Sequence, residues 1–160
     1  VGAFLPDPFT FRNVYPDMDA GGVAGLDADK IERRLVRKNA AEKDIAAWLH
    51  ELAGFTPVSR AAQAIVLKLS NGAYVAGSKV EDAAFLSVNP AQSAVAVAVS
   101  EFGRTDVEAV WFYAQSAAPL SLSALQTLRP LMTKGATVHH LEESGFTRLT
   151  LAEAALRAAS

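Results

Sequence analysis

The feature that most constrains the fold is a pair of short β-prone runs separated by Asn71 and Gly72. Residues 64–69 read AIVLKL and residues 73–77 read AYVAG. Asn-Gly between two such runs is the strongest short-range hairpin signal, because both turn residues tolerate positive φ. The sequence therefore predicts an antiparallel β-hairpin in this part of the chain.

A helix start follows the hairpin. Asn89 is a favoured N-cap residue, Pro90 fits the first helical position, and Gln92 stands where a capping glutamine is expected. Gly103 is a natural stop. Because the Ala/Val-rich run between these signals is apolar nearly all round, we expect this helix to be buried at the centre of the fold.

The remaining elements are predicted from apolar runs and breakers. Helical spacing of apolar residues follows a capping pair at Asp29 and Glu32 and continues to Gly54, with a break expected near Asn39. Residues 107–114 lack polar alternation, which favours a buried strand of a parallel sheet. Three later segments are predicted as well. A helix should run from 121–123 toward Met132, and Pro130 should kink or end it. A short strand is expected over 136–141, and residues 146–151 form either a further strand or the lead into a terminal helix over 151–159.

The order of these elements predicts the fold class. Helix, hairpin, helix, strand, helix and strand in succession favour a three-layer α/β/α domain, in which a mixed sheet contains a β-hairpin followed by parallel strands. We assign this domain to residues 27–160. Residues 1–26 carry several prolines and a glycine cluster without apolar periodicity, which indicates an N-terminal arm or interdomain linker.

Composition excludes several classes of function. The chain has no cysteine, so it has no disulfide, no thiolate metal site and no cysteine nucleophile. Its net charge is −2, which provides no electrostatic footprint for nucleic acid or for an anionic membrane. No apolar run has the length of a membrane span, and we expect a cytoplasmic protein.

The order of elements is similar to that of the cytidine deaminase family, and the family's first motif can be placed on this chain. In active members the second hairpin strand leads into a segment of the form G-C-N-x-E-N-A, and residues 77–85 stand in its place here as GSKVEDAAF. The resemblance places the family's nucleoside-binding asparagine on Lys79, whereas the matching acid is retained as Glu81. The resemblance extends over about residues 56–151.

The same resemblance indicates that the catalytic zinc site is lost. Active members carry a His or Cys, an Ala and a Glu at the start of the buried helix, and P-C-x-x-C before the next helix; the corresponding positions here hold Pro90, Gln92, Leu120 and Ser123. A zinc of this class needs three deprotonated N or S ligands and a carboxylate general acid/base. We therefore expect no catalytic residue, no metal and no cofactor in this chain, with zinc bound only by a catalytic partner domain.

Some members of the family contain two tandem copies of the domain, and this chain resembles the zinc-less C-terminal copy. Residues 5–9, LPDPF, look like the linker between the copies, and the first residue is Val1, so we expect a fragment that begins at a domain boundary. The resemblance implies that the partner is a second copy or a catalytic cytidine deaminase domain. It also suggests Phe85 as a side chain offered to a partner's nucleoside site, while packing of Phe85 in its own core is an equal alternative.

Two further function classes remain open. A freestanding pseudoenzyme would bind a nucleoside or a protein partner, and an enzyme with new chemistry would have Glu81 but no obvious second group.

Other residues carry weaker signals. His139 and His140 point to opposite faces if they lie on a strand, so they cannot converge on one metal, and His50 lies apart from them. A basic cluster is interspersed with acidic residues and fits a solvated helix face: Lys30, Arg33, Arg34, Arg37 and Lys38.

Overall fold

A computed structural model describes residues 35–53, 56, 59–81, 87–103, 105–115 and 119–159. The expected arm at 1–26 and the capping pair at Asp29 and Glu32 lie outside the described residues. The main sheet has the strand order β1-β3-β2-β6-β7-β8. Its strands are β1 (Val36–Arg37), β2 (Gln63–Leu69), β3 (Tyr74–Ser78), β6 (Val107–Ala114), β7 (Met132–Glu142) and β8 (Gly145–Leu149).

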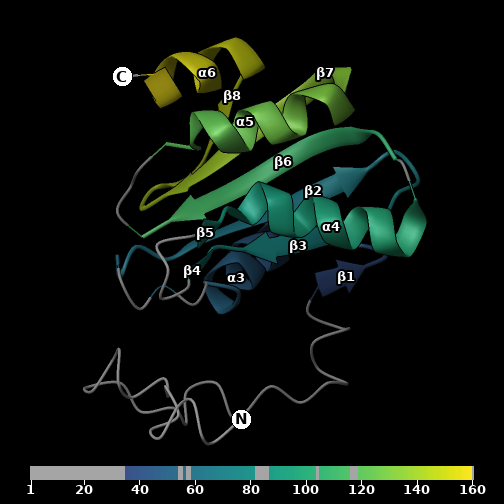
Figure 1. Cartoon of the computed structure of the whole chain (residues 1–160), viewed down its shortest axis with the longest axis horizontal. Helices are drawn as coiled ribbons and strands as arrows, with labels where there is room; N and C mark the ends of the chain where they lie inside the picture. The colour runs from purple at the N-terminus through teal and green to yellow at the C-terminus, as the bar shows by residue number, and fades with distance from the viewer. Residues whose placement is uncertain are drawn as a thin grey trace, which may run out of the picture.

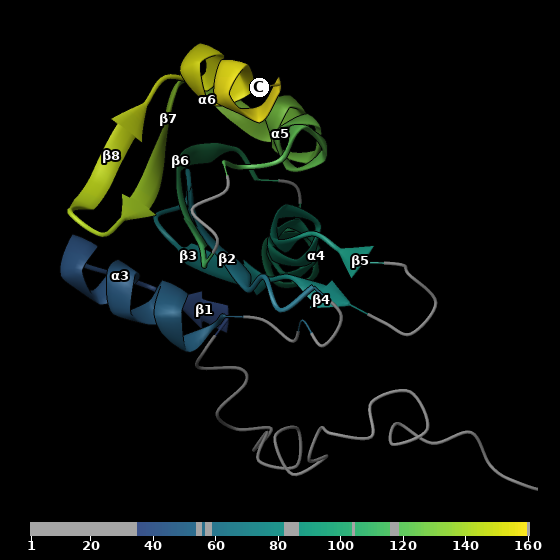
Figure 2. The ribbon, with the colours of Figure 1, turned by 90° about the vertical axis from the view of Figure 1, so that its left-hand side faces the viewer.

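The sheet is mixed, as expected, and helices cover both of its faces (Figures 1 and 2). β6 and β7 run parallel, whereas the other neighbouring strands are antiparallel. One face packs against α3 (Glu42–Glu51). The opposite face packs against three helices: α4 (Pro90–Phe102), α5 (Leu122–Leu128), which continues into the 3₁₀ turn η2 (Arg129–Leu131), and α6 (Leu151–Ala159). The predicted three-layer α/β/α class is confirmed.

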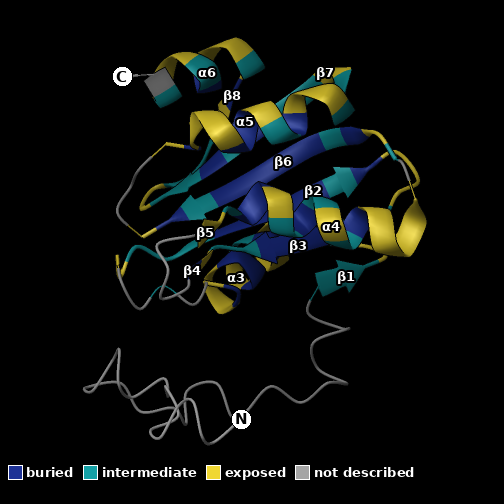
Figure 3. Cartoon of the chain, in the orientation of Figure 1, coloured by how far each residue is buried: buried dark blue, intermediate teal, exposed yellow. Residues whose placement is uncertain are grey.

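The core is split by the sheet into two clusters, one on each face. Strand alternation sends Ile65 and Leu67 toward α4, while Ala64 and Val66 contact the α3 side. β2 and β6 are buried along most of their length, which Figure 3 shows as the dark band at the centre of the sheet.

No helix in the described ranges combines the length and the hydropathy needed to cross a bilayer.

The predicted hairpin is present, although its turn differs from the expected geometry. β2 and β3 pair in register from Ala64 opposite Ser78 to Lys68 opposite Tyr74. Gly72 has φ of 85°, but Asn71 is not among the residues with positive φ. Instead, the Asn71 Oδ1 accepts a hydrogen bond from the Ala73 backbone N–H at 2.9 Å. The asparagine thus stabilises the turn through its side chain rather than through a left-handed backbone.

The helix after the hairpin begins and ends where the sequence predicts. α4 has the complete capping box between Asn89 and Gln92, with Pro90 in the first turn and Gly103 at its C-cap with φ of 69°. The sequence predicts a helix buried at the centre of the fold, but only one side of this helix is buried. Its buried side faces the sheet through small residues such as Ala91 and Ala94, while Val99 and Phe102 are exposed.

Two other expectations need correction. The helical region predicted to continue through residues 36–37 is replaced there by β1, because Val36 pairs with Val75 and Arg37 with Tyr74 at the sheet edge. The strand predicted over 136–141 is longer, since β7 covers Met132–Glu142. The region over 146–151 resolves into both alternatives: β8 ends at Leu149 and α6 begins at Leu151.

Candidate functional site

The N-terminal ends of α4 and α5 lie against each other on one face of the sheet. Asn89 caps α4, and Ser121 caps α5 by accepting a hydrogen bond from the Ala124 N–H at 3.2 Å. The two ends are joined by side chains, because the Asn89 Nδ2 donates to the Ser123 Oγ at 3.4 Å. The Ser121 and Ser123 hydroxyl oxygens are 3.2 Å apart. This junction is the first candidate site.

All four positions at which the resemblance expects a zinc centre belong to this junction or adjoin it. Pro90 is buried in the first turn of α4 and Leu120 is 4% exposed just before α5. Ser123 is exposed in the first turn of α5. Gln92 uses its carboxamide oxygen to accept from the Asn89 N–H at 3.2 Å, which completes the capping box.

The donor set at this junction does not fit a zinc ion. Proline and leucine provide no ligand atom, and the serine and glutamine provide only neutral oxygens, whereas such a zinc needs deprotonated N or S ligands. Within the described ranges, no group of three or more His, Cys, Asp or Glu side chains is arranged to hold a metal. The hydrogen bond from Asn89 to Ser123 connects the two helix ends, while Gln92 is used in the capping box of α4.

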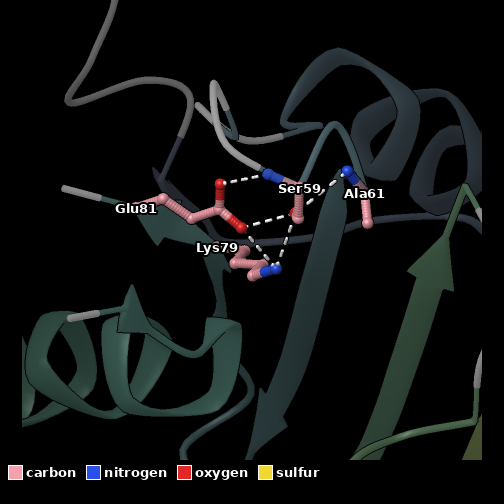
Figure 4. Close-up of polar contacts among 4 residues, drawn as sticks. All are labelled: Ser59, Ala61, Lys79 and Glu81. Atoms are coloured by element: carbon pink, nitrogen blue, oxygen red, sulfur yellow. Dashed lines mark hydrogen bonds and ion pairs between the residues drawn. The ribbon is translucent and has the colours of Figure 1, made fainter. Parts of the chain in front are cut away.

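A second cluster contains both polar residues that the resemblance assigned to a nucleoside site (Figure 4). Lys79 follows β3, and Glu81 ends the short strand β4 (Val80–Glu81), which pairs with β5 (Ser87–Val88). The Lys79 ammonium lies 2.7 Å from the Glu81 Oε1. Glu81 is 7% exposed, so its carboxylate is held in this pair within the protein.

Ser59 completes this second cluster and was not predicted from the sequence. Its backbone N–H donates to the Glu81 Oε2 at 3.0 Å, and its hydroxyl donates to the Glu81 Oε1. The same hydroxyl accepts from the Lys79 ammonium and from the Ala61 N–H, each at 3.1 Å. Glu81 is therefore engaged by three groups of its own chain. Phe85, the third predicted contact, lies outside the described residues.

The register of the hairpin explains why Ser59 and Glu81 meet. β2 and β3 are antiparallel, so the residues before β2 lie beside those after β3, and the Lys79 N–H donates to the Gln63 carbonyl at 2.9 Å. This neighbourhood is implied once the hairpin is known. No local motif marks Ser59 as the residue that would contact the carboxylate.

The histidines of β7 point to opposite faces, as predicted. His139 stacks on Trp111 at a ring distance of 5.1 Å, whereas His140 stacks on Phe112 at 5.4 Å. Burial lowers the pKa of both imidazoles, and positive charge adds to the effect, from Arg148 on His139 and from Arg157 on His140. Because the two rings lie on opposite faces of the sheet, they cannot share one metal ion.

The described part of the basic cluster has a structural role. The Arg37 guanidinium lies 4.2 Å from the centre of the Trp48 ring, and it approaches the Glu51 carboxylate at 3.9 Å. Lys38 is exposed. The other three members, Lys30, Arg33 and Arg34, lie outside the described residues.

We expect Asn89→Ala to destabilise the domain by about 1–2 kcal/mol, because it removes the α4 cap as well as the link to α5. Ser123→Ala is the matched control, since it removes the link to α5 while the capping box stays intact, and we expect a loss of only a few tenths of a kcal/mol, as for an exposed side chain. Urea unfolding of both variants measures the difference. Equal losses would mean that the cap does not stabilise the junction.

The fold resembles solved structures of cytidine deaminases. The enzyme from Mycobacterium leprae is 16% identical, with a TM-score of 0.51 over 64% of this chain and 92% of that one. The enzyme from Mycobacterium tuberculosis is 18% identical, with a TM-score of 0.52 over 62% and 83%. A mutant of the latter enzyme aligns with a TM-score of 0.57 at 15% identity, over 68% and 89%.

Comparison at the level of sequence finds no such match. No family model and no curated protein matches the chain. At identities this low, the structural likeness shows that the fold is cytidine-deaminase-like, and it extends no further than the fold.

Proposed function

We propose that this chain is a catalytically inactive cytidine-deaminase-like domain that acts as the C-terminal structural and dimerisation half of a zinc-dependent cytidine deaminase. In this proposal the hydrolytic deamination of cytidine or deoxycytidine takes place in a separate N-terminal half that binds the zinc. The chain itself contributes its fold and its surface. Its partners are that catalytic domain, a second copy of itself, or both.

The junction of α4 and α5 is the observation that carries the proposal. Two helix N-termini that would have to offer ligands to a zinc ion are instead capped by Asn89 and Ser121 and linked through Ser123. Gln92, in the place of the general acid/base, has no proton equilibrium near neutral pH and is used for capping. Both the metal and the proton transfer would need new residues.

The second cluster supports a structural role as well. A nucleoside hydroxyl bound by Glu81 would have to compete with the Lys79 ammonium at 2.7 Å and with two hydrogen bonds from Ser59. An acid already engaged by three groups of its own chain contributes less to ligand affinity, because those contacts must be broken first. This weakens the alternative of a freestanding pseudoenzyme that binds a nucleoside.

The proposal is tested by the intact mass of the protein from its source and by reconstitution. The chain has a mass of 16.9 kDa. A markedly larger source protein that carries a zinc-binding cytidine deaminase domain before this sequence is the expected result. A mass near 16.9 kDa would contradict the two-domain parent and favour a freestanding pseudoenzyme.

Reconstitution uses the N-terminal half of that source protein, produced separately. We expect the two halves to co-elute and the deaminase activity of the N-terminal half to rise when this chain is added. The matched control is the same chain unfolded by heat before mixing, which should leave the activity unchanged. Failure of the folded halves to associate would contradict the proposed structural role.

A further inference from the structure

A buried histidine faces a small cavity beneath the C-terminal helix. His140 is 6% exposed, and its Nε2 has no hydrogen-bond partner among the described residues. The cavity has a volume of about 10 Å³ for the centre of a water-sized sphere, which is room for roughly one water molecule. Phe112, Leu120 and Val138 line it together with His140, and α6 contributes Ala154 and Arg157 to the lining.

Glu142 connects this histidine to α6. Its Oε1 lies 3.5 Å from the His140 Nδ1 and 3.3 Å from an Arg157 guanidinium nitrogen. The other oxygen accepts a hydrogen bond from the Thr147 hydroxyl at 2.8 Å. One carboxylate oxygen on β7 is therefore shared by the imidazole and by the cation that α6 brings to it.

The attachment of α6 to the rest of the domain is light. Ala154 is its one buried residue among the side chains described, and Leu151, Ala155 and Ala158 are only partly buried against the core. Leu156 is 72% exposed. A terminal element with so little buried apolar surface is drawn from the low-stability end of a fold and can open without global unfolding.

We propose that His140, Glu142 and Arg157 form an acid-sensitive latch for α6, in which protonation of His140 releases the helix from the sheet. A charged imidazole takes the shared Glu142 oxygen as its own partner and repels the Arg157 guanidinium that competes for it. It also places a charge in an apolar cavity, and opening α6 hydrates that charge.

The surroundings of His140 determine the direction of the pH dependence. Glu142 on its own strand and Arg157 on α6 are the ionisable groups that act on it, while β6, β8 and the segment before α5 contribute Phe112, Leu149 and Leu120. Burial lowers the pKa of His140 most, Glu142 opposes this shift, and Arg157 adds to it. Once α6 is open the imidazole regains its ordinary pKa of about 6.5, so the open form binds more protons below that pH and acid favours opening.

Hydrogen exchange of the α6 amides tests the latch in the full chain. We expect their protection factors to fall between about pH 7 and about pH 5.5, by at most about eightfold, because a single proton taken up by an open form of pKa about 6.5 limits the change over this range. Amides of α4 should keep their protection over the same range. The hydrogen bond from Thr147 is the main cause of the lowered pKa of Glu142. Glu142 therefore stays ionised as long as the pH is kept above about 5.

His140→Leu should make the protection of α6 independent of pH in this window. The matched control is His139→Leu, because His139 also has a lowered pKa but lies on the opposite face, and it should keep the pH dependence of the parent chain. The same pH dependence in His140→Leu would overturn the proposal.

An NMR titration of the unmodified chain provides a test that needs no variant. The His140 imidazole should titrate below the value of a free histidine, and the loss of α6 protection should begin near the free value and level off at pH values below the His140 midpoint. A His140 midpoint at or above the free value, or constant α6 protection between the free value and the His140 midpoint, would overturn the latch.

Discussion

Gly77→Ala is expected to destabilise the domain by about 3 kcal/mol, at the upper end of the usual cost of overpacking a core. A Cβ on Gly77 would lie 2.3 Å from the Ala94 backbone nitrogen and 2.4 Å from the Pro90 carbonyl oxygen. Both atoms belong to the backbone of α4, so no side chain can rotate away to make room. The helix itself would have to move off β3, and the junction with α5 would move with it.

Gly135→Ala is the matched control for this prediction. A Cβ there has no atom within 4 Å, and Gly135 does not have a positive φ. Its effect should therefore stay within about 0.5 kcal/mol, as for other surface substitutions. Urea unfolding of both variants measures the two losses, and a Gly77→Ala protein as stable as Gly135→Ala would mean that α4 does not pack this closely on β3.

Glu81→Ala is expected to cost about 3–5 kcal/mol, the usual effect of removing one partner of a buried ion pair. The Lys79 side chain is only 17% exposed, so its ammonium would lose its partner inside the protein. The Ser59 N–H and hydroxyl would lose their acceptor at the same time. Replacing both ion-pair members, as in Lys79→Met with Glu81→Leu, should recover part of the loss, because no buried charge then remains unpaired.

The pair formed by Lys68 and Glu108 provides the matched control. Its atoms approach to 2.9 Å, but the two side chains are 36% and 40% exposed. Glu108→Ala should therefore cost less than about 1 kcal/mol, because exposed ion pairs contribute little. If Glu81→Ala costs no more than Glu108→Ala in thermal and urea unfolding, Glu81 is not a structural anchor, and a role in ligand binding would regain support.

The elements that could be predicted correctly depend on signals between near neighbours. Asn71 and Gly72 specify a hairpin, and Asn89 with Gln92 specifies a helix start, because the groups that satisfy each other lie within three residues. The positions that form the junction of α4 and α5 are related to one another in the sequence only through a resemblance. Its side-chain link from Asn89 to Ser123 connects residues that only the folded chain brings together.

The expectations that failed involve contacts that are distant in sequence. Residues 36 and 37 follow a helical pattern, yet their pairing with β3 draws them into the sheet edge, where tertiary contacts override local propensity. The buried face of α4 is narrower than its composition indicates, since the sheet covers only one side of the helix. Ser59 was missed because its partner, Glu81, is 22 residues away.

Zinc content measured together with cytidine turnover tests the proposed inactive site most directly. The chain is produced in zinc-supplemented medium, and the metal is quantified by mass spectrometry beside an active cytidine deaminase treated in the same way. We predict zinc far below a stoichiometric amount and no uridine above the blank, because the side chains of Pro90, Gln92, Leu120 and Ser123 offer no deprotonated N or S ligand. Stoichiometric zinc accompanied by deamination of cytidine would contradict this account.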